Sequence, residues 1–317
     1  GFARSDDWSP GAGLEPPPVA DAPAMPSSRP ATAVMRLMER ARAGEALDED
    51  ELTRLFSVRG DDCQHLLRLA DEARAESCGD TVSYVVNRNI NYTNLCTYKC
   101  SFCAFSKGKT HEDLRGAPYV LDMSEVARRT EEAWRRGATE VCLQGGIHPA
   151  FTGQTYLEVL HAVKEAAPDM HVHAFSPLEV TQGAKTLGIP LENFLRQLKA
   201  AGLGTLPGTA AEILDDEVRR QICPDKVNTA AWFGVMRTAH ALGLRTTSTI
   251  MFGHLETTRH WARHLLRLRE LQLETGGFTE FVPLPFVHME APVYRRGLAR
   301  PGPTWRETML MHAVARL

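Results

Sequence analysis

Three cysteines, Cys96, Cys100 and Cys103, stand close together in the run NLCTYKCSFCAFS, with the spacing C-x3-C-x2-C. Thiolates are strong ligands for zinc and for iron–sulfur clusters, and coordination itself deprotonates the thiol. A structural zinc site closes its tetrahedron with four protein ligands, whereas this trio leaves one metal position open. The spacing therefore predicts an iron–sulfur cluster with one iron available to a ligand. A non-catalytic zinc-binding module is the alternative from a different class of protein.

The composition excludes two classes of partner. The chain has 317 residues, of which 43% are hydrophobic and 24% are charged, and its formal net charge is -3. Such a balance supplies no broad basic field for nucleic acid. No apolar run approaches the roughly 20 residues that a membrane-spanning helix needs. We therefore expect neither nucleic acid nor a membrane as a partner.

The use of cysteine indicates the compartment. Seven cysteines are scattered without a paired framework, and no secretory signal precedes them, so we predict a cytoplasmic protein. Four of them stand apart from the trio and are expected to be buried small hydrophobes rather than ligands, because free cysteine is among the most buried residue types. They are Cys63, Cys78, Cys142 and Cys223.

The organisation of the chain follows from hydrophobic periodicity. Residues 1–30 are rich in proline, alanine, aspartate and serine, which predicts a disordered linker. Residues 31–80 are expected to form a helical lead-in, since apolar residues recur at helical spacing. From residue 81 onward strands and helices alternate. Strands are predicted at 81–94, 140–144, 170–175, 205–208, 246–252 and 277–287, and helices at 122–137, 156–167, 191–201, 230–242, 258–273 and 304–317.

Six strands that alternate with helices predict an α/β fold, a parallel (βα) barrel of the TIM type over residues 81–317. A doubly wound open sheet fits less well, because no glycine-rich dinucleotide fingerprint follows the first strand. The cysteine loop then lies at the carboxyl end of the first strand.

In such barrels the functional groups lie on loops at the carboxyl ends of the strands, which we call the mouth. Gly145 and Gly146 follow the second strand, where missing side chains let the backbone approach a ligand closely. Ser176, Glu179 and Glu212 follow the third and fourth strands. A carboxylate at the mouth can bind ribose hydroxyls or a substrate ammonium, and a helix cap or a solvated acid is the alternative.

Two histidines alternate along the third strand, His171 and His173, so their imidazoles share one face. His173 is closer to the mouth and is the better candidate for binding substrate. A core histidine with satisfied hydrogen bonds is the alternative for either residue. No residue is assigned a catalytic proton-transfer role.

The cysteine trio, with the aromatic Phe102 before its last member, resembles the signature of the radical S-adenosylmethionine (SAM) superfamily. This resemblance implies a 4Fe-4S cluster on the three cysteines, whose open iron is chelated by SAM and whose electron cleaves SAM to a 5′-deoxyadenosyl radical. It also implies that Gly145 and Gly146 contact the methionine moiety and that backbone near Phe105 meets the adenine.

A second stretch of this resemblance lies near the fifth strand. Residues 249–256, TIMFGHLE, are similar to the superfamily's G-x-I-x-G-x-x-E motif, with Thr249 and Met251 as departures. Gly253 and Glu256 stay in register with the motif. The resemblance implies that these two residues also belong to the cofactor site.

Further stretches resemble the tyrosine-using half of the FO synthase family, the 5-amino-6-(D-ribitylamino)uracil: L-tyrosine 4-hydroxyphenyl transferases. They include residues 87–94, 103–108, 173–179, 206–219 and 281–292. The resemblance implies hydrogen abstraction from L-tyrosine and transfer of its 4-hydroxybenzyl group to 5-amino-6-(D-ribitylamino)uracil, toward FO, the deazaflavin precursor of coenzyme F420. It implies an electron donor and, in fused forms, a second radical SAM domain upstream.

Two expectations qualify this resemblance. The family continues beyond Leu317, so the barrel is expected to be incomplete at its C-terminal end. The alternative enzyme is a radical SAM enzyme of the futalosine route to menaquinone, which has the same cysteine spacing. The tract VHMEAP at 287–292 and the run KGK at 107–109 favour the FO synthase family.

Overall fold

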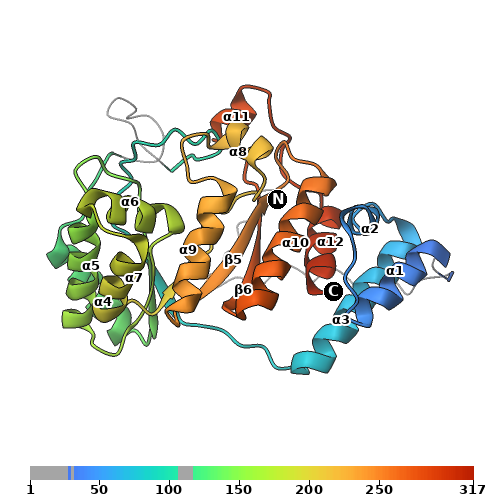
Figure 1. Ribbon diagram of the computed structural model, residues 1–317, viewed down its shortest axis with the longest axis horizontal. Coiled ribbons are helices and arrows are strands. Elements are labelled where there is room, and N and C mark those ends of the chain that lie inside the picture. Colours follow the sequence, from blue (N-terminus) through green and yellow to red (C-terminus); the bar gives the residue numbers. More distant parts are fainter. Residues whose placement is uncertain (1–27, 30–31, 106–116) are drawn as a thin grey trace, which may run out of the picture.

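The computed structural model describes residues 28–29, 32–105 and 117–317. In these ranges one parallel sheet runs in chain order without reversal (Figure 1). A sheet wound in one direction is typical of a TIM-type barrel, whereas a doubly wound sheet reverses its order at a switch point. The predicted parallel α/β architecture is confirmed. The strands are β1 (Asn87–Asn91), β2 (Glu140–Gln144), β3 (His171–Ala174), β4 (Thr205–Leu206), β5 (Arg245–Phe252) and β6 (Phe278–Pro285).

Six helices form where their periodicity predicted them. Asp122 begins the first of them, because its side chain accepts a hydrogen bond from the backbone N–H of Glu125. These helices are α4 (Met123–Arg135), α5 (Gly153–Ala166), α7 (Leu191–Ala200), α9 (Thr229–Ala241), α10 (Thr258–Thr275) and α12 (Trp305–Arg316). None of the described helices is long and apolar enough to span a bilayer.

Three further helices lie in mouth segments for which the periodicity predicted no helix. They are α6 (Pro177–Leu187), α8 (Asp216–Ile222) and α11 (Pro292–Arg295). The start of α6 carries a readable signal: Ser176 and Glu179 form a reciprocal capping box with proline at the first helical position. The helix-cap alternative therefore describes both of these residues.

The strand predicted over residues 81–94 is wrong at its beginning, because β1 starts only at Asn87. Its neighbour β2 begins at Glu140, which lies opposite Asn87, so the preceding residues have no strand to pair with. Val82 and Tyr84 are 85% and 83% exposed. Their β-branched and aromatic composition does not form a strand without a partner. The segment crosses instead from the first helices to the sheet (Figure 1).

The helical lead-in consists of α1 (Thr32–Arg42), α2 (Glu49–Leu55) and α3 (Gly60–Cys78). These helices share one apolar core with α10 and α12. The rings of Phe56 and Trp261 meet edge to face at 5.2 Å, and Arg263 lies 2.9 Å from Glu49. The lead-in is therefore attached to the barrel along an apolar seam. The predicted linker lies outside the described residues, apart from residues 28 and 29.

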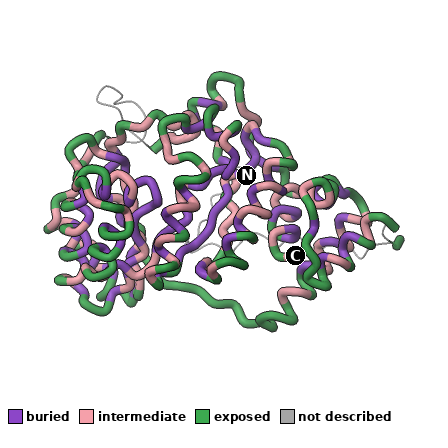
Figure 2. Tube along the Cα trace, viewed as in Figure 1, coloured by how far each residue is buried: buried purple, intermediate pink, exposed green. Residues whose placement is uncertain are grey.

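The two faces of the sheet differ in polarity. Residues that face the helices are apolar and buried, among them Ile90, Leu143 and Val172. Figure 2 shows that buried segments run along the sheet and the helices that cover it. On β1 to β4 the alternate residues point to the inner face and are mostly polar. Asn89 lies opposite Cys142, which lies opposite His173, which lies opposite Thr205. TIM-barrel interiors are usually filled by branched aliphatic side chains, so this polar inner face is suited to a polar ligand.

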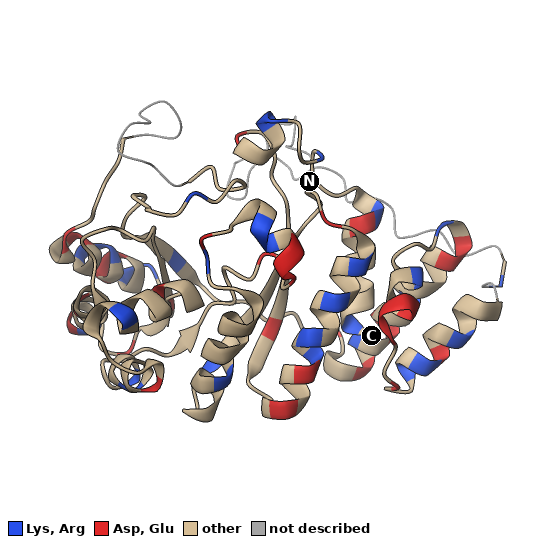
Figure 3. Ribbon diagram, turned by 45° about the horizontal axis from the view of Figure 1, so that its top comes forward, with Lys and Arg blue, Asp and Glu red and all other residues tan. Residues whose placement is uncertain are grey.

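Acidic and basic residues are interspersed along the outer helices (Figure 3). The pair Arg237 and Glu274, 2.6 Å apart, is an example on adjacent helices.

The four cysteines outside the trio divide into two groups. Cys63 and Cys223 are buried as predicted, but Cys78 is exposed near the end of α3 and Cys142 is half-buried on the inner face. No disulfide joins any of the seven cysteines, all of which lie in the described ranges.

Candidate functional site

A cavity of about 500 Å³ lies at the carboxyl ends of the strands, at the predicted mouth. The three trio cysteines line it. So do six other residues singled out from the sequence: Phe105, Gly145, Gly146, Ser176, Glu179 and Glu212. His173, Gly253 and Glu256 are not among its described lining residues. The fold thus brings most of the predicted site residues to one cavity.

The cysteine loop is fixed by the loop that follows β2. Gly146 donates its backbone N–H to Thr93 O at 3.0 Å, and Thr97 donates to Ile147 O at 2.9 Å. Ile147 in turn directs its N–H at the Cys96 sulfur, at 3.4 Å. Hydrogen bonds to ligand sulfurs are one of the means by which proteins tune iron–sulfur clusters. The contact therefore suits a thiolate that binds metal.

The glycine pair is required by close packing. A Cβ on Gly146 would lie 2.2 Å from the backbone oxygen of Leu95, and one on Gly145 would lie 2.3 Å from the Tyr92 ring. Neither position accepts a side chain without a shift of its neighbours. This packing explains why glycine stands here, while the contact of the pair with methionine stays a prediction.

The thiols fit the predicted cluster. Three cysteines of one short loop line the same cavity, and a set of three thiols is the donor chemistry that iron–sulfur clusters use. Burial raises the pKa of the Cys100 thiol to about 12, so its thiolate requires coordination to a metal. Phe105 is 37% exposed and faces the cavity next to this loop.

Glu179 ties three elements together at the edge of the cavity. Its carboxylate accepts hydrogen bonds from the Tyr92 hydroxyl, from Gly145 N at 3.1 Å and from Ser176 N at 2.7 Å. Burial raises the pKa of Glu179, although these hydrogen bonds oppose the shift. The side chain connects the ends of β1 and β2 to the start of α6. Its described contacts are structural, and substrate binding by Ser176 or Glu179 stays a prediction.

His173 lies on the inner face of the sheet, near Thr205. Its Nδ1 is 2.7 Å from the Thr205 hydroxyl, and Nε2 of His171 is 2.9 Å from the same oxygen. Burial, reinforced by neighbouring His171, lowers the pKa of His173 to about 4. The imidazole is therefore neutral near physiological pH, able to donate one hydrogen bond and accept another.

Gly253 and Glu256 shape the loop between β5 and α10. Gly253 has φ of +96°, and a Cβ there would lie 2.3 Å from Pro303. The buried Glu256 carboxylate accepts from His254 N at 3.0 Å and from the Trp261 indole at 2.8 Å. Nδ1 of His254 lies 2.9 Å from the same carboxylate. These contacts face the protein interior, and a cofactor role for the two residues stays a prediction.

Replacing Glu256 with glutamine is expected to lower stability at neutral pH by about 3 kcal/mol. Burial alone would raise the pKa of Glu256, but His254, Gly253 and Trp261 together lower it from 4.5 to about 2. A depressed pKa stabilises the fold above the unfolded value and loses that contribution as the pH falls from 4.5 toward 2. Urea unfolding across this range should show a weaker pH dependence in E256Q than in the parent protein.

The matched control is Glu270→Gln, on the exposed face of α10. This substitution also removes one carboxylate, but that carboxylate is exposed and belongs to no buried hydrogen-bond network like that of Glu256. Equal unfolding midpoints for E256Q and E270Q at neutral pH would contradict the structural role given to Glu256.

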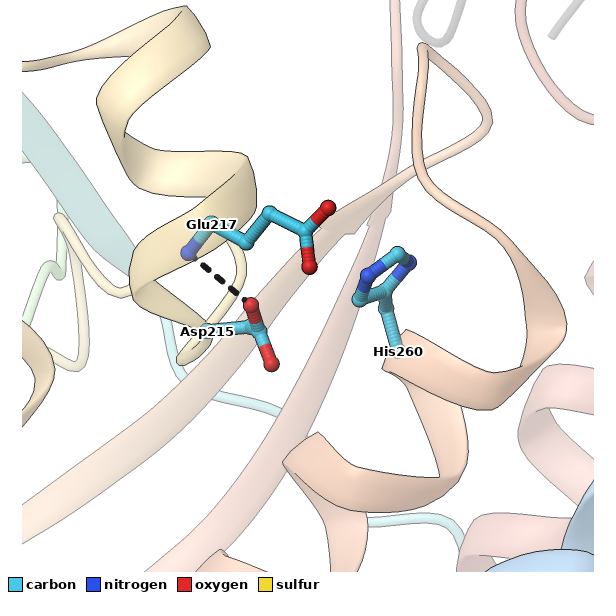
Figure 4. Close-up of side chains that lie close together, drawn as sticks. All are labelled: Asp215, Glu217 and His260. Carbon is cyan, nitrogen blue, oxygen red and sulfur yellow. Dashed lines mark hydrogen bonds between the residues drawn. The ribbon is translucent and has the colours of Figure 1, made fainter.

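Another trio of possible metal ligands, Asp215, Glu217 and His260, comes from the beginnings of α8 and α10 (Figure 4). Their ligand atoms lie within 4.8 Å of one another. Asp215 accepts from Glu217 N at 3.0 Å, as the cap of α8, and pairs with Arg263 at 2.6 Å. His260 accepts from Thr257 N at 3.0 Å. These contacts explain the positions of Asp215 and His260 without a metal.

Two kinds of lining residue were missed from the sequence. Asn91, at the end of β1, lines the cavity, and the alternation Asn87, Asn89, Asn91 was a readable signal for a polar strand face. Lys226 also lines the cavity. It follows α8, a helix that the periodicity did not predict, so no pattern placed it at the mouth.

The chain belongs to the radical SAM superfamily, whose family model matches residues 90–268. This range begins in β1 and ends in α10, so it covers the cysteine loop and most of the sheet. Membership of this superfamily confirms the predicted cofactors, a 4Fe-4S cluster and SAM.

Among its curated relatives is the 5-amino-6-(D-ribitylamino)uracil--L-tyrosine 4-hydroxyphenyl transferase of Methanopyrus kandleri, 51% identical over 84% of this chain and 72% of that protein. The FO synthase of Streptomyces avermitilis is 48% identical over 94% of this chain. The chain spans 34% of the length of that FO synthase. These relatives confirm the family resemblance found in the sequence.

Similarity to a solved structure of low sequence identity supports the fold and nothing further. The FeFe-hydrogenase maturase HydG from Carboxydothermus hydrogenoformans superposes with a TM-score of 0.67. The alignment covers 89% of this chain and 62% of that one, at 17% sequence identity. The barrel architecture is therefore shared across a large distance in sequence.

Proposed function

We propose that this chain transfers the 4-hydroxybenzyl group of L-tyrosine to 5-amino-6-(D-ribitylamino)uracil, in the synthesis of FO. The observation that carries the proposal is the 51% identity to a protein named for this transfer, over 72% of that protein's length. A cavity lined by three cysteines at the mouth of a parallel barrel supports it.

Within this proposal Cys96, Cys100 and Cys103 hold the 4Fe-4S cluster, while Gly145, Gly146 and Phe105 border SAM. When bound, the cluster and SAM supply the electron and the radical that abstracts hydrogen from tyrosine. The glycine pair brings the backbone of β2 against the cysteine loop, where a side chain would collide with Leu95 or Tyr92. Gly253 and Glu256 support the site from the neighbouring loop.

The inner face of the barrel offers the groups that a ribityl chain requires. No hydrogen bond joins the side-chain amides of Asn89 and Asn91 to another residue in the described ranges, so their donors and acceptors remain available to a ligand. Neutral His173, whose Nδ1 contacts the Thr205 hydroxyl, leaves its Nε2 for one further hydrogen bond. A polyol makes several hydrogen bonds, and such groups give specificity in otherwise enclosed sites.

The opposite side of the cavity is apolar. Met251 from β5 lines it together with Leu284 and Phe286 from the end of β6 and the residues that follow. An apolar wall suits the aromatic ring of tyrosine and excludes water from a reactive fragment. The cavity therefore provides one polar and one apolar surface, in keeping with the two proposed substrates.

The proposal is tested with anaerobically reconstituted protein, SAM, a chemical reductant, L-tyrosine and the ribitylaminouracil. We expect a coupled product that requires both substrates, together with 5′-deoxyadenosine. Product formation only with a futalosine-type substrate would favour the menaquinone-pathway alternative. A colourless protein with stoichiometric zinc would instead favour the zinc-binding module.

Replacing Asn91 with alanine is expected to weaken binding of the ribitylaminouracil about tenfold, equivalent to one lost hydrogen bond of about 1.4 kcal/mol. Binding of tyrosine should stay unchanged, because Asn91 lies on the polar side of the cavity. Anaerobic calorimetry gives both dissociation constants. The control is Asn87→Ala, which alters the same strand face at its far end. Equal effects of N91A and N87A on the uracil would contradict this assignment.

Partners and organisation complete the proposal. The reaction needs an electron donor, and the 34% coverage of the Streptomyces FO synthase supports a second radical SAM domain upstream in a fused protein. We place the protein in the cytoplasm, where thiols stay reduced.

Residues 1–30 are proposed as a linker, 31–80 as the lead-in and 81–317 as the barrel unit. The run at 107–109 that favours the FO synthase family lies outside the described residues.

A further inference from the structure

A buried ion pair lies at the mouth of the barrel, beside the cysteine loop. Nζ of Lys226 is 2.8 Å from Oε1 of Glu212, and their side chains are only 11% and 6% exposed. Glu212 belongs to the segment between β4 and α8, and Lys226 follows α8. Charges in such an enclosed position are little screened by salt, so they act strongly on their neighbours.

Three observations place this pair against the cysteine loop. The Lys226 ammonium lies 5.0 Å from the centre of the Phe102 ring, which directly precedes Cys103. Ser101 donates its backbone N–H to Ile222 O, at the end of α8, at 2.8 Å. Both charged residues line the same cavity as Cys100. The pair is therefore a neighbour of the loop that binds the cluster.

The fold holds both charges in place. Burial alone would lower the pKa of Lys226, but Glu212 and the nearby thiols raise it, so the side chain remains an ammonium. Glu212 has φ of +46°, a left-handed conformation that few residues other than glycine adopt. Its backbone oxygen accepts from Met251 N at 2.9 Å, which fixes this turn to β5. A buried charge pair retained in a strained turn calls for a function beyond packing.

We propose that the Lys226–Glu212 pair sets the reduction potential of the cluster held by the cysteine loop. Reduction adds one electron to the cluster, and the added negative charge is stabilised by a nearby cation and destabilised by a nearby anion. The ammonium therefore raises the potential and the carboxylate lowers it. The proposal rests on the cofactor of the superfamily and does not depend on the identity of the two substrates.

The test is a potentiometric titration of the cluster followed by electron paramagnetic resonance, without added SAM, on protein of matched iron content. Lys226→Met removes the cation and is expected to shift the midpoint to a lower potential. Glu212→Gln removes the anion and is expected to shift it to a higher one. A tenfold change in the ratio of oxidised to reduced cluster corresponds to about 59 mV for this one-electron couple, and we expect shifts of that order.

Three further variants make the result decisive. Lys226→Arg keeps the charge and should restore most of the parent potential. The double variant K226M/E212Q should lie between the single variants, and Lys185→Met, on the exposed end of α6, should leave the potential unchanged. A general loosening of the site would move both single variants in the same direction. Shifts of the same sign, or unchanged midpoints in both, would overturn the proposal even if substrate turnover were normal.

Discussion

Replacing Cys100 with alanine is expected to leave the purified protein without a stable cluster and without activity. The parent protein should be brown and carry about four irons per chain, as a 4Fe-4S cluster requires. The variant should lose most of this iron and its visible absorption, because two cysteines of a three-ligand loop do not hold a cluster. Iron and sulfide assays under anaerobic conditions measure the loss.

The control for this experiment is Cys78→Ala, since Cys78 is an exposed cysteine of α3, outside the cavity. It changes the number of thiols without touching the cysteine loop, so its iron content should equal that of the parent protein. Full iron in C100A, with a spectrum that still responds to SAM, would refute the assignment of Cys100 as a ligand. A colourless parent protein would refute the cluster itself.

Replacing Gly146 with alanine is expected to reduce cluster assembly severely, although alanine is chemically inert. The added Cβ would lie 2.2 Å from Leu95 O and 2.9 Å from the Cys96 Cβ. Because both contacts are to the cysteine loop itself, the loop must shift and the Cys96 sulfur moves with it. We expect an iron content far below that of the parent protein, at a similar or slightly lower unfolding temperature.

Gly234 in α9 provides the control, because a Cβ there meets no atom within 4 Å. Gly234→Ala should assemble the cluster normally and stabilise the helix by up to about 1 kcal/mol. If G146A loads iron as well as G234A does, the close contact between the glycine pair and the cysteine loop is not needed for assembly.

The alternation of strands and helices could be predicted from the sequence wherever a periodic segment had a partner to pack against. β2 matches its predicted range, and β6 starts one residue after the beginning of its predicted range. The segment before Asn87 shows the limit of such prediction, since strand-forming residues make no strand where the neighbouring chain has not yet begun. Helix α6 was missed because its capping box was interpreted as part of a binding loop.

The residues of the candidate site also divide into those that the sequence could predict and those that it could not. Ligands close in sequence, such as Cys96 and Cys100, were predictable because a short loop alone brings them together. The contact between Gly146 and Leu95, and that between Lys226 and Phe102, join segments far apart in the chain, so no local pattern indicates them. Glu256 shows a third case: its motif matched, and its carboxylate accepts a hydrogen bond from the Trp261 indole, but Glu256 is not among the described lining residues of the cavity.

The apolar seam between the lead-in and the barrel also affects how long the lead-in helices stay uncovered while the chain is synthesised. Leu66 of α3 packs in the same core as Leu310 of α12, and Arg306 donates to Val58 O across 248 residues of chain. Until α12 leaves the ribosome, the apolar side of α1, α2 and α3 lacks part of its cover. The two sides of this core are separated by 248 residues at the Arg306–Val58 contact, so the lead-in helices expose apolar surface to chaperones while that length of chain is synthesised.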